Sequence, residues 1–178
     1  MSIYFLRHGE SEANVKGVFD GQGLNSELTI LGGKQAEQAA QELTSIDIKD
    51  IYSSPLKRTR KTAEIVSDRI GFPLNQIKFD DRLMEHDVGR LSGLPYDTDE
   101  YLKAKLIGDA ENNIKFQKRI LSFLHDHKDD KYNMLMVSHG GVGSMIEASR
   151  RGLDVSEFYE VVSYPNAHIV PIDLDWLK

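Results

Sequence analysis

The sequence predicts an α/β fold, a three-layer sandwich in which a mostly parallel central sheet carries helices on both faces. Three observations lead to this prediction. Short apolar runs alternate along the chain with segments of helical composition or spacing. One run, at residues 134–138 (MLMVS), is apolar almost without interruption, as is typical of a strand inside a parallel sheet. Polar residues follow directly after several of these runs, at the strand ends where α/β sheets bind their ligands.

Composition narrows the class of protein further. The chain has 178 residues, no cysteine and a formal net charge of −6. A chain of this length is expected to form one domain with a core that needs no disulfide or metal. The lack of cysteine excludes thiol catalysis and thiolate metal sites. Net acidity without a basic block argues against nucleic acid or an anionic membrane as a partner.

The sequence also predicts where the protein resides. No apolar run approaches the roughly 18 residues of a membrane span. The N-terminal sequence MSIYFLRH has no basic region followed by a long apolar stretch, so it does not resemble a secretory signal. We therefore expect a cytoplasmic protein.

Each expected element has a local reason in the sequence. Residues 3–6 form a short apolar run of strand type. Residues 34–43 are rich in Ala, Gln and Glu, which favours a helix. Residues 51–52 indicate a second buried strand, and residues 55–70 carry apolar side chains at helical spacing. Ser54 is expected to be the N-cap of this helix, whose first residue would be proline.

The second half of the chain continues the alternation of strands and helices. A weak strand is expected at residues 78–83 and a short helix at residues 96–107. An amphipathic helix at residues 114–127 precedes the apolar strand already described. A further helix at residues 140–151 and a last strand at residues 167–174 follow it.

The residues best suited to chemistry stand next to these strand ends. Arg7 and His8 follow the first strand, Arg58 lies one turn into the helix after the second, and His139 follows the apolar strand. Guanidinium groups bind phosphate oxygens with two donors at once, and helix N-termini present free N–H groups. A histidine is also a competent nucleophile or proton carrier. Taken singly, each short motif is most often an ordinary turn, but together they predict a pocket for an anion.

Four blocks of the sequence stand out together, and they are residues 6–14 (LRHGESEAN), 53–63 (SSPLKRTRKTA), 83–85 (LME) and 137–141 (VSHGG). In sequence and in order they resemble the motifs of the histidine phosphatase superfamily, the phosphoglycerate-mutase-like proteins. The resemblance implies the phosphoglycerate-mutase-like fold, with residues 1–178 as a single histidine phosphatase domain and a short lid insertion around residues 94–112. The loop at residues 15–27 departs from the family pattern, because its spacing is one residue longer than usual.

The resemblance implies a role for each matching residue. His8 matches the nucleophile that becomes phosphohistidine, and Glu85 matches the proton donor. Three residues match the groups that hold the phosphoryl oxygens, and these are Arg7, Arg58 and His139. Three more match substrate-binding positions, and these are Asn14, Gly21 and Gly140. The resemblance implies neither a metal nor a cofactor.

These observations lead us to expect a metal-independent phosphomonoesterase that hydrolyses a small phosphorylated metabolite through a phosphohistidine on His8. The mutases that the chain resembles carry a longer lid rich in Arg and Lys, whereas residues 94–100 (LPYDTDE) are acidic, which favours hydrolysis. Three alternatives stay open: a phosphoprotein (phosphohistidine) phosphatase, a phosphoglycerate mutase and an inactive binding module of the same fold. The expected partner is a small-molecule phosphate ester, and the sequence predicts no oligomeric state.

Overall fold

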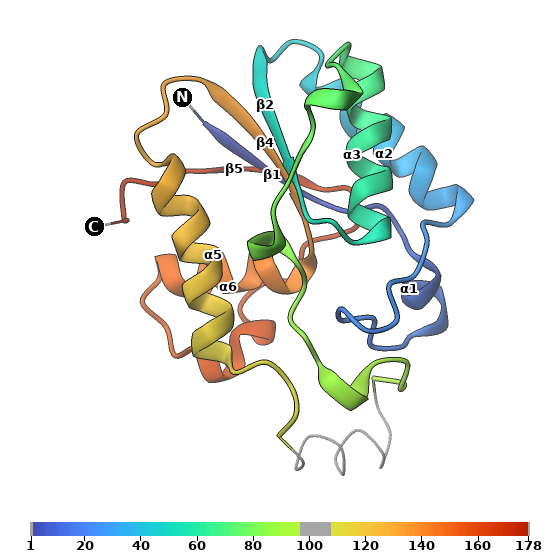
Figure 1. Cartoon of the computed structure of the whole chain (residues 1–178), viewed down its shortest axis with the longest axis vertical. Coiled ribbons are helices and arrows are strands. Elements are labelled where there is room, and N and C mark those ends of the chain that lie inside the picture. The colour runs from blue at the N-terminus through green and yellow to red at the C-terminus, as the bar shows by residue number, and fades with distance from the viewer. Residues whose placement is uncertain (1, 97–107, 178) are drawn as a thin grey trace.

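The structure, a computed structural model, describes residues 2–96 and 108–177 and is built around a five-stranded sheet (Figure 1). The strands lie in the order β3-β2-β4-β1-β5. The pairs β1–β4, β2–β4 and β2–β3 are parallel, and β5 is antiparallel to β1. The strand bounds are β1 Ile3–Arg7, β2 Ile48–Ser53, β3 Lys78–Phe79, β4 Asn133–Ser138 and β5 Ile169–Ile172. The mostly parallel sheet expected from the sequence is confirmed.

Helices cover both faces of this sheet (Figure 1), as the sequence predicts. On one side lie α2 and α3, and on the other lie α5 and α6. The helix bounds are α1 Glu12–Lys16, α2 Ile30–Leu43, α3 Lys57–Ile70, α5 Asn113–His127 and α6 Gly140–Arg150. Within the described ranges, no helix is long and apolar enough to cross a membrane.

The central strand β4 shows how its sequence leads to the layered packing. Met134 and Met136 belong to a buried cluster with side chains of α5 and α6. Leu135 and Val137 belong to a second cluster with side chains of α2 and α3. Because successive side chains of a strand point to opposite faces, a strand covered on both faces needs apolar residues at nearly every position. This requirement explains the uninterrupted apolar run.

The structure differs from the sequence prediction at the start of α3. Leu56 is the cap residue and makes no side-chain capping bond, so the helix begins two residues later than expected. Ser54 is therefore not the N-cap. Its hydroxyl accepts a hydrogen bond from the N–H of Leu56 at 3.3 Å and lies 2.9 Å from Nε2 of His139. The prediction was wrong because the backbone is still extended at Leu56 (φ −64°, ψ 145°), so the helical conformation begins only at Lys57.

The segment after α3 also departs from the prediction. Only Lys78–Phe79 of the expected strand 78–83 pairs with β2. Asp80 then accepts a hydrogen bond from the N–H of Arg82 and starts a short 3-10 turn, η2 (Asp81–Leu83). Of the expected helix 96–107 and lid insertion 94–112, residues 97–107 lie outside the described part of the chain.

The strand order brings three carboxyl ends to one edge of the sheet. β4 lies between β1 and β2 and runs parallel to both, so all three strands end on the same side. The N–H of His8 donates to the carbonyl of Ser138 at 3.0 Å, and the N–H of Ser54 donates to the carbonyl of Val137 at 3.0 Å. Segments far apart in the sequence are thereby held side by side at the sheet edge.

Candidate active site

His8 stands at the end of β1 and is buried. Its Nδ1 lies 2.6 Å from the carbonyl oxygen of Gly9, and a carbonyl can only accept, so Nδ1 carries the ring proton. Its Nε2 therefore keeps a lone pair, and it accepts a hydrogen bond from Nε of Arg58 at 3.3 Å. Burial, followed by the charges of Arg58 and Arg7, holds the pKa of His8 well below its ordinary value. His8 is an uncharged imidazole with a basic nitrogen at the site.

Arg58 lies in the first turn of α3, and its side chain is 1 % exposed. Its Nη2 donates to the carbonyl of Gly21 at 2.9 Å, and its Nη1 lies 3.2 Å from a carboxylate oxygen of Asp20. Burial lowers the pKa of Arg58, and the Asp20 carboxylate opposes that shift. The guanidinium is thus fixed on three sides, by Asp20, Gly21 and His8.

Arg7, the last residue of β1, approaches the site from the other side. Its Nη1 donates to the carbonyl of Tyr164, whereas its buried Nε has no hydrogen-bond partner among the described residues. Burial lowers the pKa of Arg7, and the charge of Glu85 opposes that change. Among the described residues, the Nε–H of Arg7 therefore has no acceptor beside the pocket.

His139 is the cap residue of α6 and is fully buried. Its ring centroid lies 5.3 Å from that of His8, with an angle of 64° between the ring planes. Burial and the nearby charge of Arg58 hold the pKa of His139 well below its ordinary value, so this imidazole is also uncharged. Its Nδ1 is buried and has no hydrogen-bond partner in the described part of the chain.

Glu85 follows η2 and points its carboxylate at the start of α6. One carboxylate oxygen accepts from the N–H of Gly141 at 3.1 Å, and the other accepts from the N–H of His86 at 2.9 Å. The N-terminus of a helix stabilises negative charge, so the first turn of α6 is a favourable place for this group. The carboxylate is held by backbone donors at the same edge of the sheet as His8.

The three predicted substrate-binding positions lie around the same space. Asn14, on α1, accepts a hydrogen bond from the side chain of Asn166 at 3.1 Å. Gly21 has a φ of 53°, and a Cβ there would lie 2.6 Å from a methyl carbon of Val88, so the turn requires glycine. Gly140 is the first residue of α6.

These residues lie around one cavity of about 560 Å³. All the residues predicted from the sequence line it except His139, which lies beside His8. Among the described lining residues the cationic side chains are Arg7 and Arg58. Much of the remaining wall is aromatic or apolar and is formed by Phe19, Val88, Tyr96, Tyr159, Val162 and Tyr164.

In the described part of the chain, no three His, Asp or Glu residues lie close enough together to hold a metal ion. The positive charge that the described lining of the cavity offers an anion is on the guanidinium groups of Arg7 and Arg58.

Sequence reasoning missed several residues that shape the site. Asp20 pairs with Arg58, and the side chain of Asn166 donates to the carbonyl of His8 at 3.1 Å. Ser54 lies in one of the four blocks that resemble the family, but its sequence pattern predicts a helix cap and not the contact that its hydroxyl makes with Nε2 of His139. Arg119 donates to the carbonyl of Glu85 at 2.9 Å. For Asp20 the one available signal was the unusual spacing of its loop, and Asn166 and Arg119 had none.

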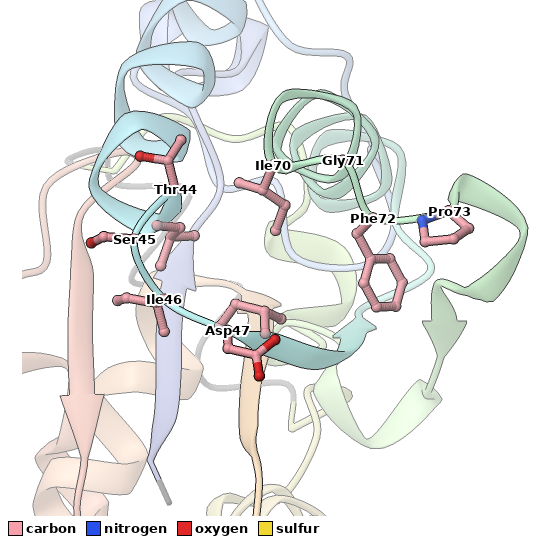
Figure 2. A pocket seen from close by; sticks show the side chains of 10 residues that line it. Thr44, Ser45, Ile46, Asp47, Ile70, Gly71, Phe72 and Pro73 are labelled. Carbon is pink, nitrogen blue, oxygen red and sulfur yellow. The ribbon is translucent and has the colours of Figure 1, made fainter.

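A second hollow, of about 500 Å³, lies elsewhere in the molecule. Figure 2 shows it between the C-terminal ends of α2 and α3, with Thr44, Asp47, Gly71 and Phe72 among its lining residues. It adjoins the start of β2, whereas the catalytic candidates follow the ends of the strands. It contains none of the predicted site residues, so it is not part of the candidate active site.

The fold and the site together define a class of protein. It is an α/β layered protein whose parallel strands end at a pocket with two fixed guanidinium groups and an uncharged, buried histidine. Comparison with known proteins identifies the family within this class. The model of the histidine phosphatase superfamily (branch 1) matches residues 3–175, and the chain belongs to that superfamily.

Two relatives illustrate the range of the family. A Hydrogenobacter thermophilus protein named "Putative phosphoserine phosphatase 2" is 35% identical over 189 residues, covering 99% of this chain and 91% of that protein. A 2,3-bisphosphoglycerate-dependent phosphoglycerate mutase of Thermoplasma acidophilum is 46% identical over 88 residues, covering 49% of this chain and 42% of the mutase.

Solved structures support the fold. The structure of Bacillus stearothermophilus YhfR has a TM-score of 0.85 and 23% identity, covering 98% of this chain and 91% of that one. A mycobacterial glucosyl-3-phosphoglycerate phosphatase has a TM-score of 0.80 and 24% identity, covering 97% of this chain and 92% of that one. The superfamily, the fold class and a phosphatase of this superfamily as the class of enzyme are confirmed.

Proposed function

We propose that this chain is a metal-independent phosphomonoesterase that hydrolyses a small phosphorylated metabolite through a phosphohistidine on His8. The observation that carries the proposal is the state of His8. Nδ1–H donates to the Gly9 carbonyl, so the lone pair of the ring is on Nε2, which faces the cavity and accepts a hydrogen bond from Nε of Arg58. An uncharged imidazole held in one tautomer is the form that can attack phosphorus.

The two arginines have the position and chemistry needed to hold the phosphoryl group. Asp20 and Gly21 fix the guanidinium group of Arg58. The buried Nε–H of Arg7 donates no hydrogen bond to any described residue. Phosphoryl transfer depends mainly on positioning and on charge stabilisation, which fixed guanidinium groups supply. His139 adds a buried Nδ1 without a partner in the described ranges, and Asn14, Gly21 and Gly140 complete the wall.

The proposed reaction has two displacements at phosphorus. Nε2 of His8 forms a bond to phosphorus, the ester P–O bond breaks, and Glu85 donates its proton to the departing alcohol. Water then attacks the phosphohistidine, Glu85 accepts a proton from that water, and inorganic phosphate is released as the N–P bond breaks. Two easier steps replace one difficult displacement, and the same carboxyl group serves as acid and then as base.

The cavity favours a small substrate over the alternatives left open by the sequence. Its volume of about 560 Å³ falls within the range typical of small-molecule sites, which runs from about 300 to 1,000 Å³. A mutase needs cations for a second phosphate, whereas Arg7 and Arg58 are the cationic residues among the described lining. We also propose that residues 1–178 form a single domain with a short lid insertion around residues 94–112.

The direct test is hydrolysis of p-nitrophenyl phosphate in the presence of EDTA. We expect the wild-type protein to release p-nitrophenol at an unchanged rate with chelator, and the His8→Ala variant to be inactive although folded. The matched control is His125→Ala, because His125 is an exposed histidine on α5. Wild-type rates in His8→Ala, or activity lost in EDTA and restored by Mg²⁺, would contradict the proposal.

A further inference from the structure

Arg119, on α5, donates hydrogen bonds from its guanidinium group to the backbone of the segment that carries Glu85 and to Glu111. Its Nη1 donates to the carbonyls of Arg82 at 2.7 Å and Met84 at 2.6 Å. Its Nη2 donates to the carbonyl of Glu85 at 2.9 Å and to Glu111 at 2.9 Å, and its Nε donates to Glu111 at 2.8 Å. A guanidinium group has five N–H donors, and all five are used here.

Glu111 secures the same segment from the opposite direction. Besides its two bonds with Arg119, its carboxylate accepts from the N–H of Asp87 at 3.3 Å. Its own N–H donates to the carbonyl of Asp87 at 2.7 Å, and its carbonyl lies 2.7 Å from Nε2 of His86. The residues on both sides of Glu85 are thus tied to a partly buried ion pair in which the side chains of Arg119 and Glu111 are 18 % and 16 % exposed.

The backbone carbonyls of this segment depend on side-chain donors because the segment has no regular secondary structure. After η2 the chain from Met84 to Val88 is neither helix nor strand, so its carbonyls have no regular ladder to accept from. A carbonyl that is shielded from water and loses its donor destabilises its local conformation. Arg119 satisfies three such carbonyls at once, and Gln22 adds one more bond to the carbonyl of Glu85 at 2.8 Å.

We infer that Arg119 is a positioning residue for Glu85 and that it acts through the backbone. This inference rests on the proposed function, in which Glu85 donates the proton to the leaving alcohol. Arg119 is not among the residues that line the cavity, so it does not touch the substrate. Its effect is to keep the backbone of residues 82–85 in the one arrangement that aims the Glu85 carboxylate at Gly141 and the pocket.

The inference predicts a loss that depends on the leaving group. An alkyl alcohol must be protonated as it departs, whereas p-nitrophenolate needs almost no proton. Displacing a catalytic group by about 1 Å can slow a reaction by roughly 10²-fold. We therefore expect Arg119→Met to lower kcat/KM for β-glycerophosphate by about 10–100-fold, with a change of about threefold or less in kcat/KM for p-nitrophenyl phosphate. We compare kcat/KM because it reports the steps up to departure of the leaving group and leaves out the hydrolysis of the phosphohistidine, which both substrates share. Arg119→Lys keeps the positive charge but loses the planar guanidinium group with its five N–H donors, and it should show the same pattern more weakly.

The matched control is Arg82→Met. The Arg82 guanidinium lies at the same segment and pairs with Asp80 and Asp126, but it makes no bond to Glu85. We expect this variant to have the wild-type ratio of rates on the two substrates. A general loss of stability would lower both rates equally, so the ratio separates positioning from mere folding.

A double variant makes the test decisive. Arg119→Met should add no leaving-group effect once Glu85→Gln is present, because the acid that it positions is gone. Equal losses on both substrates in Arg119→Met, with a selective loss in Glu85→Gln, would overturn the positioning role alone. Equal losses of kcat/KM on both substrates in Glu85→Gln would instead refute Glu85 as the acid in the proposed function.

Discussion

The Arg58→Lys substitution tests the geometry of the phosphate pocket while keeping its charge. Arg58 uses three nitrogens in three directions, toward His8, Gly21 and Asp20. A lysine has one nitrogen at the end of a flexible chain, so it cannot keep all three contacts. The carbonyl of Gly21 would lose its donor, and Nε2 of His8 would lose the group that faces it.

The size of the effect follows from which contacts are lost. Removing one donor aimed at the developing charge of a transition state lowers kcat by roughly 10²–10³-fold, or about 3–4 kcal/mol. Separately, leaving the carbonyl of Gly21 without its donor should lower the free energy of unfolding by about 1–3 kcal/mol. We therefore expect kcat/KM for p-nitrophenyl phosphate to fall at least 10²-fold, with a lower melting temperature but a folded protein.

The control for this variant lies one half-turn along the same helix. Arg60 is exposed, and its guanidinium lies 3.9 Å from the ring centroid of Phe79. Arg60→Lys makes the same chemical change outside the pocket and should leave kcat/KM unchanged. A folded Arg58→Lys protein with near-normal kcat/KM would show that Arg58 does not hold the phosphoryl group as proposed.

Three further predictions follow from other features. The lowered pKa values of His8 and His139 mean that below pH 6.5 the unfolded chain binds protons that the folded protein does not, so the melting temperature should fall as pH drops below 6.5. A flat melting temperature between about pH 6.5 and 5.5 would refute this. A Cβ on Gly32 would lie 2.1 Å from a backbone oxygen, so Gly32→Ala should destabilise the protein by about 1–3 kcal/mol, whereas Gly33→Ala, with its nearest neighbour at 3.9 Å, should not. With 3-phosphoglycerate and a bisphosphorylated primer, ³¹P NMR should detect inorganic phosphate as the main product, and rapid primer-dependent formation of 2-phosphoglycerate would favour a mutase.

The strands and catalytic candidates could be predicted because each leaves a local signal. β4 is buried on both faces, and this burial produces an apolar run that stands out in the sequence. His8 and His139 come directly after such runs, so the rule that ligands bind at strand ends locates them without any structure. Arg58 follows β2 by one helical turn, and the family resemblance supplied Glu85, which has no such neighbour.

Other features could not be predicted because their partners are remote in the sequence. Ser54 precedes a proline and so has the local pattern of a helix cap, yet its hydroxyl faces His139, 85 positions away. Arg119 lies 34 positions from Glu85, and nothing in its own helix distinguishes it from a solvated arginine. Asp20 lies in an irregular loop that no periodicity describes. Contacts of this kind exist only once the sheet has brought the segments together.

The central claim is the covalent intermediate on His8, and trapping it is the most direct test. The protein would be mixed with p-nitrophenyl phosphate in EDTA, quenched in alkali on the millisecond scale, and its peptides analysed by mass spectrometry. The account predicts a phosphate on His8 that is stable to alkali, labile to acid and formed at least as fast as the enzyme turns over. Turnover without a phosphoenzyme, or a phosphate trapped on a residue other than His8, would contradict it.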